Sequence, residues 1–421
     1  MIRKFFKNKE LLKRIGFTFV VLMFFRFGAS IAVPGINPAA MVMIGSGSVF
    51  SALNLLGGGA LEKMSIFAMG VSPYITAGII IQLLAMDVIP ALAELKDNGD
   101  KGQKKMEKIT RWLALVLCFV QALSITYGLD KQYQILLNPS VWTYLYTASI
   151  MTAGSMGLVW LGDQITRKGV GNGLSMIIFA GIAANIPHSF MQSWNILMGN
   201  ADSAHVFNGI LMFVLYCLFY IAIIAGVVIV ETAQRRIPVQ QASGSTGGNM
   251  TYVPFKINSA NVIPVIFAQS VISAPQIIIS FFNTGMYQKL SRLFSLTSPF
   301  GLIVYAVLTF LFTFFYTDLE IDPSKVADNL KKSRSYIPGI RPGTETETYL
   351  SKVLMRITFY GATALTLLAV LPYLLTMITP LSGTTGLGGT SIIIVVGVAL
   401  ETVGQIRSRL TERSYKSFFD R

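Results

Sequence analysis

The sequence predicts an all-α polytopic membrane protein with ten transmembrane helices. Of its 421 residues, 53% are hydrophobic and only 13% are charged, whereas a soluble domain carries about 25% charged residues. The apolar residues form long unbroken runs, each near the roughly 20 residues that a spanning helix needs. A membrane β-barrel would instead show alternating segments of about 10 residues. Because the bilayer offers no water to backbone polar groups, these runs must span as helices.

Ten apolar runs define the predicted spans. They cover residues 15–33, 72–91, 109–129, 142–162, 172–188, 207–230, 261–283, 299–317, 353–378 and 391–406. The first run follows a basic segment, as in a signal peptide, but it exceeds the usual length of about 7–15 apolar residues. We therefore interpret it as a retained span. The longest polar connections are 231–258 and 318–352, and we expect no separate soluble domain.

Lysine and arginine residues gather on one side of the predicted membrane. Of the 34, 29 lie in or beside the N-terminus, the even-numbered connections and the C-terminus. The other side has Lys63, Lys131, Lys289 and Arg292, and Arg26 lies within the first span. Positive residues stay in the cytoplasm, so this distribution predicts two cytoplasmic termini and an even number of spans. We read the net charge of +14 as a sign of topology rather than of nucleic-acid binding.

Two features break the pattern of plain spans. The apolar stretch 50–61 is too short to cross a bilayer and contains three consecutive glycines. Irregular backbone at membrane depth needs surrounding protein or a water-filled cavity, so this stretch is either an interfacial loop or a re-entrant element. The second feature is Arg26, because an ionisable residue inside a span indicates function by default. The alternative is structural, with Arg26 tying the first span to neighbouring carbonyls or water.

Ion-coupled transporters and intramembrane enzymes fit the sequence poorly. Ion-coupled transporters place ionisable side chains near the membrane midplane, but Asp87, Asp163, Glu231 and Glu401 all lie toward span ends. No span carries a paired Asp, a Ser/His pair or a His-Glu metal motif, which disfavours an enzyme, and no P-loop occurs. The two cysteines have no disulfide or metal-site spacing. A binding scaffold without a pore stays open, and conductance or crosslinking separates it from a channel.

Short motifs occur in a fixed order along nearly the whole chain. They include Phe25-Arg26-Phe27-Gly28, Val33-Pro34-Gly35-Ile36, Gly57-Gly58-Gly59-Ala60-Leu61, Pro73-Tyr74-Ile75-Thr76-Ala77, Gly171-Asn172-Gly173, Gln234-Arg235-Arg236-Ile237-Pro238, Val262-Ile263-Pro264 and Ile337-Pro338-Gly339-Ile340-Arg341. Each is weak alone, but together they are specific. By them the chain resembles the SecY/Sec61-alpha family, whose bacterial members are channel subunits of the Sec protein translocase.

The resemblance implies two inverted five-helix halves around a central pore with a plug helix. The halves would be residues 1–188, holding spans one to five, and 189–421, holding spans six to ten. A plug at about 46–65 would close the external funnel, which favours the re-entrant interpretation of the glycine-rich stretch. The plug residues implied are Asn54, Gly57, Gly58, Gly59, Ala60 and Leu61.

The resemblance also implies a pore ring of six apolar residues. They are Val71, Ile75, Leu174, Ile178, Ile266 and Ile394. Such a ring dewets, which holds ions back, and it forms no fixed hydrogen bonds to a passing chain. Val71 and Ile75 are spaced i, i+4, and so are Leu174 and Ile178, so the two side chains of each pair project from one face of their helix. Without the resemblance these residues would be ordinary core, since branched aliphatics fill every membrane helix.

A lateral gate would lie between spans two and three on one side and spans seven and eight on the other. Gln82 and Asn258 match its polar residues, although hydrogen bonding between helices explains them equally well. Asn261 stands where the family usually has glycine, which affects packing at the gate.

Basic residues of the cytoplasmic loops would contact partners. By resemblance, Arg341 serves the motor ATPase SecA and the ribosome, and Arg235 and Arg236 contact ribosomal RNA. Plain positive-inside topology is the alternative for the Arg235 pair. The loop tip 243–252 has no basic residue, unlike many relatives.

The resemblance as a whole implies a protein-conducting channel of the cytoplasmic membrane rather than an enzyme. Unfolded secretory polypeptides would cross through it, and membrane-protein helices would leave sideways into lipid. SecA or the ribosome would supply energy, and we expect no cofactor and no metal. The implied partners are SecE as a clamp on the two halves, SecG, signal peptides and nascent chains, and a membrane insertase.

Overall fold

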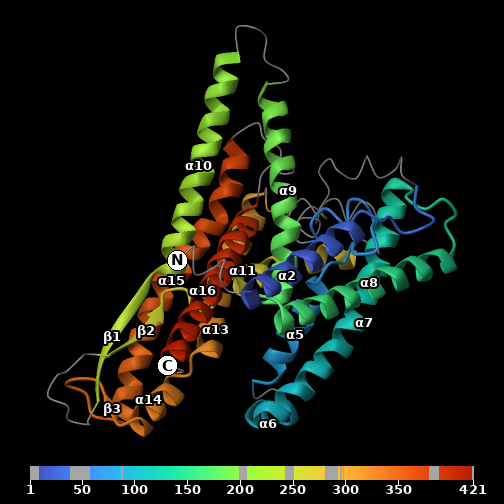
Figure 1. Ribbon diagram of the computed structural model, residues 1–421. Coiled ribbons are helices and arrows are strands. Elements are labelled where there is room, and N and C mark those ends of the chain that lie inside the picture. Colours follow the sequence, from blue (N-terminus) through green and yellow to red (C-terminus); the bar gives the residue numbers. More distant parts are fainter. Residues whose placement is uncertain are drawn as a thin grey trace.

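The computed structural model describes residues 9–37, 57–86, 89–198, 206–241, 251–279, 293, 296, 298–378 and 388–419. Within these residues ten helices, one at each predicted span, form the body of the molecule (Figure 1). In chain order they are α2 (Lys9–Gly28), α5 (Ser72–Leu84), α7 (Gly99–Tyr133), α8 (Val141–Lys168), α9 (Gly173–Met198), α10 (Val206–Thr232), α11 (Ile263–Ile279), α13 (Pro299–Glu320), α15 (Thr344–Ile378) and α16 (Gly389–Phe419). Two shorter helices, α6 (Pro90–Asp97) and α14 (Pro323–Lys332), lie between them.

Six of the described helical stretches are long and apolar enough to cross a bilayer. They are Lys101–Lys131, Gly173–Met198, Phe207–Thr232, Pro299–Lys332, Thr344–Leu375 and Gly389–Leu410. Two further apolar helices, Ser72–Leu84 and Ile263–Ser273, are shorter. The membrane-helix class is confirmed and each predicted span contains a helix, but length and composition support six crossings rather than all ten.

Two predicted boundaries are wrong. The second span, predicted to reach residue 91, ends at Leu84, and Pro90 begins α6, because proline is favoured in the first helical turn and breaks a helix interior. The fifth span, predicted to end at 188, continues as α9 to Met198 with Pro187 inside the helix. The division between halves at residue 188 therefore falls within a continuous helix.

The polar connections contain strands that the all-α prediction missed. Strands β1 (Gln234–Gln241), β2 (Thr251–Lys256) and β3 (Ser335–Tyr336) form an antiparallel sheet in the order β2-β1-β3. Ile237 and Val239 of β1 are buried, as expected for alternating residues of a strand that packs on one face. They join a small apolar core with α14 and α15. Connections 231–258 and 318–352 therefore build one compact unit.

The long helices pack in two groups on either side of α9. In the first group α7 contacts α5 and α8, and α8 contacts α2; in the second, α13 contacts α11 and α15, and α10, α15 and α16 contact one another. Helix α9 contacts α2 and α8 as well as α10 and α16. Figure 1 shows α6, α14 and the strands at the lower end of the molecule, while the end of α9 and the start of α10 reach the top.

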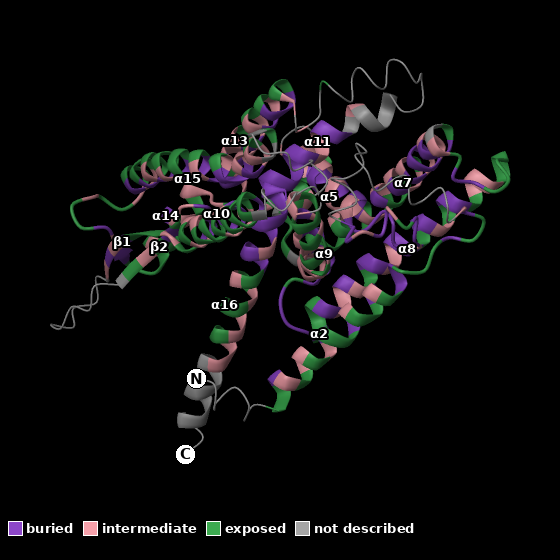
Figure 2. Ribbon diagram, turned by 90° about the horizontal axis from the view of Figure 1, so that it is seen from above, coloured by how far each residue is buried: buried purple, intermediate pink, exposed green. Residues whose placement is uncertain are grey.

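Burial falls from the centre of the molecule to its rim. Figure 2 shows buried residues around α5, α11 and the first part of α16, with exposed residues on the outer faces of α2, α10 and α15. Many of the exposed side chains are large and apolar, including Phe24, Phe207, Leu211 and Tyr360. Helices that are apolar on all sides are typical of a chain solvated by lipid.

Candidate functional site

The six residues of the predicted pore ring lie in one apolar cluster. Val71 is the residue before α5, and the other five come from α5, α9, α11 and α16. The buried members are Val71, Ile178, Ile266 and Ile394, and the half-buried members are Ile75 and Leu174. Four helices from distant parts of the sequence thus bring branched apolar side chains to one place.

Residues 57–71, which we call the glycine segment, enter the same region as a series of turns. The plug prediction covers 46–65, and Asn54 with the rest of 46–56 lies outside the described residues. The expected helix is not found in the described part, since the backbone from 57 to 64 forms turns. Ala60 is fully buried in the cluster of the pore ring, and Leu61 is buried in a neighbouring cluster. The glycine segment therefore contributes Ala60 to the same cluster as the predicted ring.

Glycine is required at position 58 for two reasons. Its φ of 70° lies in the left-handed region that side chains disfavour. In addition, a Cβ at this position would lie 2.5 Å from the Cα of Gly181 in α9. The backbone of the glycine segment consequently rests on the backbone of α9, in a contact that requires glycine at 58 and leaves little room for a Cβ at 181.

Side chains of two helices hold carbonyl groups of the glycine segment. Arg26 Nη1 of α2 donates a hydrogen bond of 2.8 Å to the Gly58 carbonyl. At the other end, the buried Ser155 Oγ of α8 donates a bond of 2.7 Å to the Gly70 carbonyl. Irregular backbone inside a membrane is tolerated when protein satisfies its polar groups. The structural interpretation of Arg26, as a tie to a neighbouring carbonyl, is therefore confirmed.

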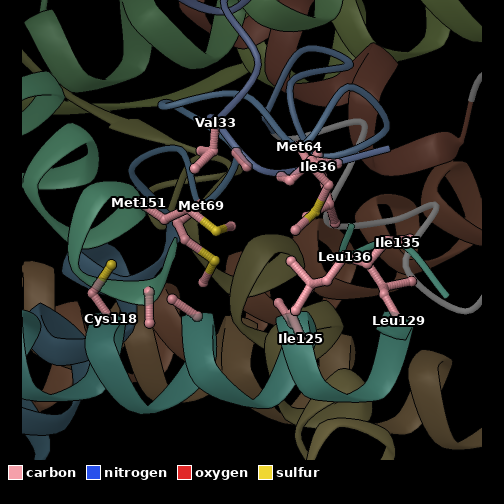
Figure 3. Packing of buried hydrophobic residues seen from close by; sticks show 14 residues of the cluster. Val33, Ile36, Met64, Met69, Cys118, Ile125, Leu129, Ile135, Leu136 and Met151 are labelled. Carbon is pink, nitrogen blue, oxygen red and sulfur yellow. The ribbon is translucent and has the colours of Figure 1, made fainter. Parts of the chain in front are cut away.

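A sulfur-rich apolar core supports the far side of the glycine segment. Figure 3 shows Met64 and Met69 of this segment pointing toward side chains that include Cys118 and Ile125 of α7 and Met151 of α8. Methionine fills irregular gaps well because its side chain is unbranched and flexible. This packing fixes residues 64–69 to α7 and α8, which leaves the glycines at the opposite end of the segment.

The two predicted gate residues do not meet. Gln82 is exposed on α5. Asn258 is buried, and its amide nitrogen donates bonds of 2.8 Å to Glu231 and 3.1 Å to the Asn261 carbonyl. Asn261 has a φ of 55°, which explains how it replaces the glycine usual in the family, since asparagine tolerates this region better than most residues.

An apolar seam, rather than a polar contact, joins α5 to α11 and α13. Ile79 of α5, Phe267 of α11 and Tyr316 of α13 are buried in one cluster. The rings of Phe267 and Phe312 meet edge-on with their centroids 4.2 Å apart. Contacts of this kind have no directional bond to break when two helices separate.

The predicted partner contacts lie on the unit built by the two long connections. Arg235 and Arg236 are exposed on β1. Arg341 lies in a turn between Gly339 and Gly343, whose φ values are 81° and 112°. Its side chain is 88% exposed and forms an ion pair of 4.0 Å with Glu345.

Three contacts near the site were not predicted from the sequence. They are the Ser155 bond to Gly70, the Glu231 bond to Asn258, and the bond of 3.2 Å from the Gly171 amide to Gln405 Oε1 of α16. A serine or glutamine in an apolar run gives no signal of its partner, so no pattern in the sequence could have found these pairs.

Comparisons with known proteins agree with this geometry. A family model described as SecY matches residues 65–403. The protein translocase subunit SecY of Halalkalibacterium halodurans is 43% identical over 425 residues, covering 99% of both chains. A solved structure of a protein-conducting channel superimposes with a TM-score of 0.67 at 18% identity, covering 94% of this chain and 92% of that chain. Sec61 in a canine ribosome–channel complex from the endoplasmic reticulum gives 0.64 at 18% identity, with the same coverage.

Proposed function

The chain belongs to the SecY family, and on that premise we propose that it is the channel subunit of a protein translocase. Unfolded secretory polypeptides cross the membrane through it, and membrane-protein helices leave it sideways into lipid. The observation that carries this proposal is the meeting of the six ring residues, from four helices, in one apolar cluster that also contains Ala60 of the glycine segment.

A constriction of this composition suits a passing polypeptide. Its branched side chains deform around different residues and form no fixed hydrogen bonds with them. At rest the same side chains exclude water, and a dewetted constriction blocks ions. The glycine segment adds a second barrier, because it packs on the ring and on α9. In this proposal it is the base of the plug.

Lateral release requires two helix groups to part. We assign the gate to the apolar seam of α5 with α11 and α13, because lipid or a hydrophobic signal peptide can replace its contacts at little cost. Gln82 and Asn258 are assigned to its edges. Asn258 stabilises the end of α11 through Glu231, so its role is to hold the gate helix in place.

Sidedness and partners follow from charge. The strands and α14 carry Arg235, Arg236 and Lys331 at the same end of the molecule as α6 (Figure 1). We place this end in the cytoplasm under the positive-inside rule, with both termini there and the protein in the cytoplasmic membrane. Arg341 and the Arg235 pair then face SecA or the ribosome, which supply the energy. SecE and SecG are the expected partner subunits.

Reconstitution tests the proposal. The protein is purified with SecE and SecG, inserted into proteoliposomes and supplied with SecA, ATP and a signal-bearing precursor. We expect ATP-dependent protection of the precursor from added protease, and no protection of the same precursor without its signal sequence. Protection no greater than in a sample without ATP would contradict a translocation function.

A further inference from the structure

Arg26 places a permanent positive charge inside the first predicted span, where it is partly buried. Its neighbours Phe25, in α2, and Ala29, just after the end of α2, are 1% and 5% exposed. A guanidinium group stays protonated at physiological pH, and such a group inside a membrane needs a partner. The partner here is the Gly58 carbonyl at 2.8 Å. The charge is therefore placed where it acts on the glycine segment rather than on another helix.

The Gly58 carbonyl lies where the glycine segment contacts α9. Gly58 rests on Gly181 of α9, and Ala60, two residues later, packs in the cluster of the pore ring. The hydrogen bond from α2 thus holds the segment at the point where it touches α9. Two residues later, Ala60 joins the cluster of the pore ring. If the bond were absent, the two glycines with positive φ, Gly58 and Gly59, would have no helical structure to keep them in place.

A polar cavity beside Arg26 makes the bond reversible. The cavity measures 580 Å³, and Arg26, Glu62, Lys63, Asn185 and His188 are among its lining residues. This volume can hold several water molecules, since each occupies about 30 Å³ in the liquid. When the glycine segment moves away, water in the cavity can solvate the guanidinium group. Release then does not leave a bare charge in an apolar surrounding.

We propose that Arg26 is a positioning residue that holds the glycine segment on α9 and so biases the resting channel toward its sealed state. This inference rests on the proposed channel function. A purely structural tie could use any nearby carbonyl. Arg26, in contrast, controls the position of the glycine segment and so the sealed state of the channel. Losing the bond should raise the fraction of unsealed channels by about 10- to 100-fold, the range for a hydrogen bond that involves a charged group.

The test measures resting ion flux and translocation on the same proteoliposomes. Arg26→Met removes both charge and donor and leaves the Gly58 carbonyl without this hydrogen bond, whereas Arg26→Lys keeps a charged donor. We expect a resting leak at least about ten times that of the unmodified channel for Arg26→Met, and a leak near the unmodified level for Arg26→Lys. Both variants should keep ATP-dependent precursor protection. Arg14→Gln, on the same helix but in a partly exposed pair with Glu10, is the matched control and should stay sealed.

Each outcome has one meaning. If Arg26→Met translocates but stays as tightly sealed as the unmodified channel, or if Arg26→Lys leaks as strongly as Arg26→Met, the positioning role is refuted while the channel function stands. If the unmodified complex protects no precursor, the proposed function itself fails. Should Arg26→Met not fold, Arg26→Gln replaces it, because the neutral amide keeps a weaker donor; an intermediate leak is expected, and a tight seal again refutes the role.

Discussion

Replacing Gly58 with alanine should detach the glycine segment from α9. Two costs add up at this position. A residue with a Cβ pays about 1–2 kcal/mol in the left-handed region, which is where Gly58 lies with its φ of 70°. The new methyl group would also lie 2.5 Å from the Gly181 Cα, and overpacking of this kind costs about 1–3 kcal/mol. The sum is about 2–5 kcal/mol, which disfavours the docked segment by at least about 30-fold.

Gly35 separates the two costs. It has a φ of 92°, but a Cβ built there meets nothing within 4 Å. Gly35→Ala therefore pays only the backbone cost of about 1–2 kcal/mol. We would measure the free energy of unfolding of each purified complex in mixed micelles, together with resting ion flux in proteoliposomes. Gly58→Ala should be the less stable of the two and should be the one that leaks.

Equal losses of stability in the two variants, with both channels sealed, would refute the reasoning. That result would mean that Gly181 moves away without consequence and that the backbone contact with α9 does not hold the glycine segment. Gly157→Ala, in α8, is a reference for an added methyl group without a clash, because a Cβ there also meets nothing within 4 Å; since alanine is favoured over glycine in a helix interior, it should not lower stability.

Three further substitutions have distinct expected outcomes. Asn258→Ala should lower thermal stability by about 1.5–3 kcal/mol, because the buried Glu231 carboxylate loses its donor; an unchanged melting temperature in detergent would count against this. Ser155→Ala should lower the stability of the purified complex by about 1–3 kcal/mol, because the buried Gly70 carbonyl loses its bond, and a loss below this range would show that another group replaces the serine. Arg341→Ala should leave stability unchanged, because the side chain is 88% exposed, but should weaken SecA-dependent translocation; normal SecA binding and protection would remove Arg341 from the contact surface.

The membrane helices could be predicted because each is a long apolar run, and the bilayer allows such a run only one structure. The limits of that signal appear in α5. Its apolar run continues past Leu84, so hydropathy alone predicted a longer span, whereas Pro90 begins a separate helix. In α9 the opposite happened, since the span was predicted to end at residue 188 and the helix continues to Met198 with Pro187 inside it.

The strands were missed because their pairing is not local. β1 pairs with β2 across a connection and with β3 nearly a hundred residues later. Pro238 and Pro254 also disfavour a strand assignment from sequence. Nevertheless both prolines lie in strands: Pro238 of β1 pairs with Tyr252, and Pro254 of β2 pairs with Arg236. Polar composition indicated a connection between spans but said nothing of its fold.

The ring could be located only through the resemblance. Branched aliphatic residues occur throughout the chain, and periodicity shows which of them share a helix face but not which face lines a pore. The structure adds that all six meet, that Ala60 joins them and that Arg26 holds the adjacent glycine. The turns of the glycine segment depend on contacts with α2, α8 and α9, which no local pattern encodes.

Crosslinking from the ring to a polypeptide in transit tests the central claim most directly. Single cysteines at Ile266 and Ile394, in a background without the two native cysteines, would be probed with a precursor that carries one cysteine and is stalled during SecA-driven translocation. Cysteines at Val307 and Leu367, which are 52% and 58% exposed, serve as lipid-facing controls. The account predicts disulfide bonds from the ring positions and none from the controls; bonds from the controls alone would show that the polypeptide takes another path.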